Sequence, residues 1–80
     1  MTERVPIAVP QLGVVEEIVV LEWLFASGDS VVADTPLVII ETEKAETELE
    51  SPASGTLEIA IEAGDDEYPV GTILGHVVTD

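Results

Sequence analysis

Lys44 is the side chain of this sequence that is best suited to chemistry. It is the only lysine among 80 residues. Before it, Val38, Ile40 and Thr42 share one parity while Glu41 and Glu43 share the other, and after it Thr47 and Leu49 alternate with Glu46, Glu48 and Glu50. Alternation with period two is typical of half-buried β-strands, which turn one face to a core and the other to water. The pattern predicts a β-hairpin with a single primary amine at its tip.

The simplest alternative is that Lys44 is a solvated surface residue, since lysine is common on exposed turns. The composition argues against this alternative, because the chain has 17 acidic residues but only one lysine and one arginine. The amine also stands among carboxylates, with Glu41, Glu43 and Glu46 on either side of it. We therefore treat Lys44 as a candidate functional residue.

Length and composition limit the classes of protein to which the chain can belong. Eighty residues predict one small domain, and the absence of cysteine excludes disulfides and thiolate metal sites. The net charge of −15 excludes nucleic acid and anionic membranes as partners and favours a basic protein surface. The sequence has no run of ~18 apolar residues and no secretory signal. We expect a monomeric protein of the cytoplasm, or of the mitochondrial matrix if a targeting segment is missing.

Turn residues divide the chain into eight predicted strands. Apart from 46–50, they are expected at residues 5–9, 14–25, 31–32, 37–42, 57–62, 68–70 and 73–78. The single indole, Trp23, is expected to be a packing residue of the core or its rim. The single histidine, His76, is expected at a surface or sheet position, because no cysteine or second histidine stands beside it to form a metal site.

An internal repeat indicates how the strands assemble. Gly28-Asp29 followed by Asp34-Thr35-Pro36-Leu37 resembles Gly64-Asp65 followed by Gly71-Thr72-Ile73-Leu74. Two similar halves of four strands predict an all-β fold, a flattened barrel or sandwich of two four-stranded antiparallel sheets with internal pseudo-twofold symmetry. The Lys44 hairpin should lie at one end, and the first and last strands should meet at the other.

An ordered set of short motifs resembles the lipoyl domains of the biotinyl/lipoyl attachment family. The run Glu41–Ala45 is similar to the Asp-Lys-Ala hairpin of these domains, with Glu43 where the family more often has Asp. The other similar pieces are Gln11-Leu12-Gly13, Glu22-Trp23, Gly28-Asp29, Asp34-Thr35-Pro36-Leu37, Ser51-Pro52-Ala53-Ser54-Gly55 and Val70-Gly71-Thr72. The resemblance implies one lipoyl domain over residues 1–80, cut from a dihydrolipoyl acyltransferase of a 2-oxo acid dehydrogenase complex.

The resemblance also implies a function and a set of partners. Lys44 would carry lipoate in amide linkage, attached by a lipoate ligase or lipoyl transferase. The domain would not be an enzyme itself but a swinging-arm carrier of acyl groups and reducing equivalents. It would serve a thiamine-diphosphate-dependent 2-oxo acid decarboxylase, an acyltransferase catalytic domain and a dihydrolipoyl dehydrogenase.

Two groups of residues are expected to take part in recognition by these partners. The first group flanks the lysine and consists of Glu41, Glu43, Ala45 and Glu46. The second belongs to a loop that lies near the hairpin in the family and consists of Gly13, Val14 and Val15. This loop is shorter and more apolar here than in most members, so the sequence does not identify the cognate decarboxylase or its 2-oxo acid.

Two other functions remain as alternatives. A biotin carrier is disfavoured because those relatives have Met on both sides of the lysine, where this chain has Glu43 and Ala45. An acidic, non-catalytic interaction module is the second alternative, including weak calcium binding by Asp65-Asp66-Glu67, although no EF-hand spacing is present. A salt-adapted source would produce the same acidic composition.

Overall fold

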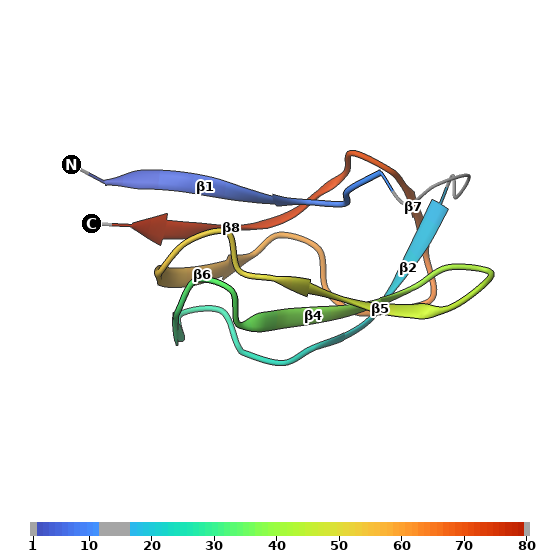
Figure 1. Ribbon diagram of the computed structural model, residues 1–80, viewed down its shortest axis with the longest axis horizontal. Coiled ribbons are helices and arrows are strands. Elements are labelled where there is room, and N and C mark those ends of the chain that lie inside the picture. The colour runs from blue at the N-terminus through green and yellow to red at the C-terminus, as the bar shows by residue number, and fades with distance from the viewer. Residues whose placement is uncertain (1, 12–16, 80) are drawn as a thin grey trace.

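The computed structural model describes residues 2–11 and 17–79, which contain eight β-strands (Figure 1). They are β1 (Glu3–Ala8), β2 (Glu17–Trp23), β3 (Ser30–Val31), β4 (Pro36–Glu41), β5 (Glu46–Glu50), β6 (Gly55–Ile59), β7 (Glu67–Pro69) and β8 (Ile73–Thr79). Within these two described ranges no residue is helical, so they contain no helix able to cross a membrane.

The strands form two four-stranded sheets with related topologies. One sheet has the order β1-β8-β6-β3 and the other β5-β4-β2-β7, and all neighbouring strands are antiparallel. Strands four places apart in the chain occupy equivalent positions: β1, β8, β6 and β3 of the first sheet correspond to β5, β4, β2 and β7 of the second. The predicted fold class, two four-stranded antiparallel sheets with internal pseudo-twofold symmetry, is therefore confirmed.

The core repeats the same symmetry in its side chains. Two clusters of buried apolar residues fill the space between the sheets. One cluster contains Val20, Ile40 and Leu74, and the other contains their counterparts from the repeat, Leu57, Val77 and Leu37. Trp23 packs against both clusters, and its indole N–H donates to the Ile61 carbonyl over 2.9 Å, so the packing role predicted for this residue is confirmed.

Two strands end two or three residues earlier than the alternation predicted, whereas the other strand ends differ from the prediction by at most a single residue. The strand expected over 57–62 ends at Ile59, because the N–H groups of Ala60 and Ile61 both donate to the Leu74 carbonyl and interrupt the ladder. The strand expected over 14–25 ends at Trp23, and a register shift between Val20 and Glu22 bends it against β4. The beginning of that expected strand, residues 14–16, lies outside the described residues.

The two ends of the molecule have different roles in the fold. The domain measures 38 × 20 × 18 Å along its principal axes. In Figure 1 both termini lie at one end of the long axis, where β1 and β8 pair from Glu3↔Thr79 onward. The turn between β4 and β5 projects at the opposite end. Under the pseudo-twofold relation, β4 and β5 correspond to β8 and β1. The hairpin and the paired first and last strands therefore lie at opposite ends of the molecule, as predicted.

Gly75 provides a direct test of the close packing around β8. It is buried at a position where β8 lies between β1 and β6, and a Cβ there would penetrate the carbonyl oxygen of Glu58. Gly75→Ala should therefore lower the free energy of unfolding by about 3 kcal/mol, measured by denaturant titration. The matched control is Gly64→Ala, since a Cβ at Gly64 would meet no atom of the described chain within 4 Å. Equal stability of both variants would contradict this packing.

Candidate functional site

The hairpin that carries Lys44 is anchored by the core on one face. Val38 and Ile40 of β4 and Leu49 of β5 are buried, whereas Glu41, Glu46 and Glu48 point to solvent. The two strands pair in register, with Ile40 opposite Thr47 and Glu41 opposite Glu46. A shift of one residue would bury the glutamates, so this alternation fixes which residues form the turn.

Four residues, Thr42-Glu43-Lys44-Ala45, connect the strands, and Thr42 organises them. The Thr42 N–H donates to the Ala45 carbonyl over 2.8 Å. The Thr42 hydroxyl donates to the same carbonyl at 3.1 Å and accepts the N–H groups of Lys44 and Ala45, each at 3.2 Å. A side chain therefore supplies most of the hydrogen bonds that shape the turn.

The Lys44 side chain is exposed at the tip of this turn. Among the described residues, its amine has neither an ion-pair partner nor a hydrogen-bond acceptor. The other cation of the chain, Arg4, does have a partner, because it reaches Glu58 across β8 at 2.5 Å. Lys44 thus offers a primary amine that is not engaged by any described side chain.

Carboxylates dominate the outer face of the sheet that carries the hairpin. Glu46 lies opposite Glu41, Glu41 lies opposite Val19 of β2, and Val19 lies opposite Glu67 of β7. These four residues form one row across the sheet, in which three of the four side chains are acidic. Like charges directly opposite one another destabilise a pair of strands, so the Glu41–Glu46 pair lowers the stability of this sheet.

The structure places the residues predicted to surround the lysine on one surface. Glu41 ends β4, Glu43 and Ala45 lie within the turn, Glu46 begins β5, and all four are exposed. Gly13, Val14 and Val15 lie outside the described residues. The recognition roles of both groups stay predictions, as does the role of Lys44.

Thr42 is a residue of the site that sequence reasoning did not identify. The sequence pattern places Thr42 only at the end of the strand expected over 37–42, whereas β4 ends at Glu41. The available signal was its residue type, because serine and threonine hydroxyls accept hydrogen bonds from main-chain N–H groups two or three residues further on. That propensity could have indicated a turn that begins at Thr42.

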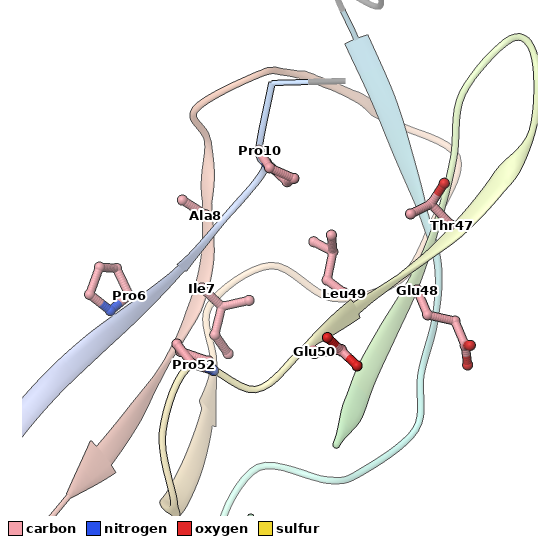
Figure 2. Close-up of a pocket in the computed structure, with 9 residues that line it drawn as sticks. All are labelled: Pro6, Ile7, Ala8, Pro10, Thr47, Glu48, Leu49, Glu50 and Pro52. Carbon is pink, nitrogen blue, oxygen red and sulfur yellow. The ribbon is translucent and has the colours of Figure 1, made fainter. Parts of the chain in front are cut away.

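A groove of about 410 Å³ is a second candidate site (Figure 2). It lies between the edge strands β1 and β5, with Ile7 and Leu49 from the core beneath it and Pro6, Pro10 and Pro52 around it. Among its described lining residues, the ionisable ones are Glu48 and Glu50. The prolines remove main-chain donors from its rim, which hinders the addition of a further strand. The groove is the open seam of the sandwich, and its described lining residues offer no set of groups suited to catalysis.

The remaining acidic residues, at 65–67, bring together no set of metal ligands within the described part of the chain. Asp65, Asp66 and Glu67 are all exposed, and no group of three potential metal ligands comes together in the described ranges. His76 lies half-buried in β8 opposite Pro6 and Glu58, which agrees with the sheet position predicted for it.

Comparison with known families gives one match that extends over both sheets. Residues 5–77 match the biotin/lipoyl family, which is described as "Biotin-requiring enzyme". The match begins in β1 and ends in β8, so it includes the hairpin and Lys44.

Several curated proteins are similar to the chain. The dihydrolipoyllysine-residue acetyltransferase component of the pyruvate dehydrogenase complex of Mycobacterium bovis is 43% identical over 74 residues, which cover 90% of this chain and 13% of that protein. The same component from Pseudomonas aeruginosa is 42% identical over 67 residues, covering 82% of this chain and 12% of its own. The dihydrolipoyllysine-residue succinyltransferase component of the 2-oxoglutarate dehydrogenase complex of Rickettsia bellii is 39% identical over 74 residues, covering 91% and 18%. The chain thus spans less than a fifth of each relative.

Proposed function

The chain belongs to the biotin/lipoyl attachment family, and from this premise we propose that it is a lipoyl carrier domain modified on Lys44. The observation that carries the proposal is the exposed Lys44 amine, which has no described partner and lies at the tip of a hairpin that is fixed on both sides. An amide-linked group fits such a site, because the attached arm would extend from the end of the molecule without displacing a core side chain.

The neighbours of Lys44 favour lipoate over biotin. Glu43 and Ala45 stand where the resemblance to biotin carriers would require methionines. The similar acetyltransferase and succinyltransferase components are named for dihydrolipoyllysine, and we extend this group to the present chain. Both acetyl and succinyl groups are candidate cargoes, since relatives of both kinds cover about nine tenths of the chain.

Lys44 would act as a nucleophile once, during attachment. Its Nζ would attack the acyl carbonyl of a lipoyl adenylate in the ligase, so that an amide C–N bond forms and the C–O bond to AMP breaks. The amine loses a proton to solvent or to a base of the ligase. When bound, the lipoyl group supplies a disulfide ring that accepts an acyl group and, with it, two electrons.

The other residues of the site would position the arm and attract its partners. The β4–β5 ladder keeps the attachment point still while the arm moves, and tethering raises the effective concentration of the cargo at each active site. The exposed carboxylates around Lys44 would steer the domain toward basic surfaces. The proposed partners are a lipoate ligase, a 2-oxo acid decarboxylase, an acyltransferase domain and a dihydrolipoyl dehydrogenase.

Shifting the lysine by one position tests whether the geometry of the hairpin selects the target. In the variant Glu43→Lys/Lys44→Glu the composition and net charge are unchanged, but the amine is attached to the main chain at a different position of the turn. We expect less than about a tenth of the wild-type lipoylation rate, measured by intact mass, because a tenfold loss needs only about 1.4 kcal/mol of misplacement. The thermal midpoint should stay near that of the wild type, since both positions are exposed.

Lys44→Arg is the matched control, because it keeps the positive charge but removes the primary amine. It should fold normally and remain unmodified. Efficient lipoylation of the shifted lysine would show that exposure and local sequence alone select the target.

Neutralising carboxylates beside the lysine tests their proposed role in recognition. Glu43→Gln/Glu46→Gln should weaken reductive acylation of the lipoylated domain by the cognate decarboxylase, seen as a higher KM, because steering toward a basic surface is lost. The free energy of unfolding should change by less than about 1 kcal/mol, as is usual at exposed sites.

The matched control is Glu62→Gln/Asp66→Asn, which removes the same charge from exposed positions of another turn. Its KM should stay close to that of the wild type. If both double variants behave alike, net charge rather than the surface around Lys44 determines recognition.

A further inference from the structure

We propose that Thr42 is a positioning residue for Lys44, whose hydroxyl closes the turn and thereby sets the direction of the amine. The inference rests on the proposed function, because it concerns how Lys44 is presented to a ligase. Thr42 itself would contact neither the lipoyl adenylate nor the acyl group that the arm carries.

The Thr42 hydroxyl uses its full hydrogen-bonding capacity within the turn. A hydroxyl has one donor and two acceptor positions. The donor is directed to the Ala45 carbonyl at 3.1 Å, and the two acceptor positions receive the N–H groups of Lys44 and Ala45 at 3.2 Å. All three bonds are long, so each contributes modestly, but together they connect one side chain to both residues that follow Glu43.

The main chain alone does not close this turn on both sides. In a two-residue hairpin turn, the N–H of the last residue ordinarily returns to the carbonyl of the first. Here the Ala45 N–H donates to the Thr42 side chain instead, and the main-chain bond across the turn runs from the Thr42 N–H to the Ala45 carbonyl. The hydroxyl replaces the acceptor that the main chain would otherwise provide.

Electrostatic repulsion opposes closure at this end of the hairpin. Glu41 and Glu46 face each other directly at the base of the turn, and Glu43 lies between them in sequence. In the part of the chain that the structure describes, no ion pair compensates these three carboxylates. The Thr42 hydrogen bonds therefore act where the strands would otherwise separate most easily.

Closure of the turn bears on the amine because it fixes the main chain on both sides of the Lys44 Cα. The Lys44 N–H and the Ala45 N–H are both anchored to one oxygen atom. Fixing these two groups restricts the dihedral angles that determine where the Cα–Cβ bond of Lys44 points. Loss of the hydroxyl should therefore leave the amine exposed but broaden the range of directions in which it is presented.

A pair of substitutions separates the hydroxyl from the shape of the side chain. Thr42→Val keeps the branched shape and the strand propensity but removes the hydroxyl, whereas Thr42→Ser keeps the hydroxyl. Thr72→Val is a control at another turn, since the Thr72 hydroxyl donates to the Pro69 carbonyl between β7 and β8.

The first measurement is amide hydrogen exchange of the isotopically labelled domain. In Thr42→Val the amides of Lys44 and Ala45 should exchange about fivefold faster than in the wild type, the factor for a hydrogen bond worth about 1 kcal/mol. In Thr42→Ser and Thr72→Val the same two amides should exchange within about twofold of the wild type.

The second measurement is the rate of lipoylation by a lipoate ligase with lipoate and ATP. Thr42→Val should be modified about fivefold more slowly, in proportion to the loss of order in the turn, and Thr42→Ser should restore the rate. Acylation of Lys44 by a small amine-reactive ester should be equally fast in all variants, because it requires exposure and not a fixed direction.

The outcomes distinguish this inference from the proposed function. A wild-type domain that no lipoate ligase modifies would refute the proposed function, and the exchange rates would still show whether Thr42 orders the turn. A Thr42→Val domain with wild-type exchange and wild-type lipoylation would overturn the inference alone. Equal slowing in Thr42→Ser or Thr72→Val would also overturn it, since the effect would then not depend on the Thr42 hydroxyl.

Discussion

The alternation of side chains along β4 and β5 is the constraint on which the rest of the structure depends. Ile40 and Leu49 can enter the core only if their neighbours Glu41, Glu48 and Glu50 face water, and this requirement sets the register of the two strands. The register in turn decides which four residues span the end of the hairpin. The position of Lys44 at the tip is thus a consequence of burial four to six residues away, which is why a small domain without disulfides can present one amine in a defined place.

Charge acts against this arrangement and also gives it a use. The formal charge of −15 makes the compact state repel itself, and the row Glu46–Glu41–Val19–Glu67 concentrates that repulsion on one face. The Arg4–Glu58 pair lies on the other sheet, nearer the termini, and is too exposed to offset much of it. The cost is therefore concentrated beside the hairpin, where a basic partner of a carrier domain would find complementary charge.

Much of the fold could be predicted from the sequence because its determinants are local or repeated. All eight strands were expected, since alternation and Gly-Asp turns are short-range signals, and the repeat revealed the symmetry of the sheets. The hydrogen bonds that end β6 at Ile59 were not foreseen, because they depend on the position of Leu74 in another strand. The role of Thr42 was missed for a different reason: the pattern placed it only at the end of the strand expected over 37–42, and the three hydrogen bonds of its hydroxyl depend on the geometry of the turn.

Attachment of lipoate to Lys44 is the central claim, and intact-mass spectrometry with peptide mapping tests it most directly. The domain would be incubated with ATP and either lipoate and a lipoate ligase or biotin and a biotin ligase. We predict that the first mixture adds the mass of one lipoyl group, mapped to Lys44, and that the second adds nothing. Biotin on Lys44, or an unmodified domain in the first mixture, would contradict the assignment of a lipoyl carrier.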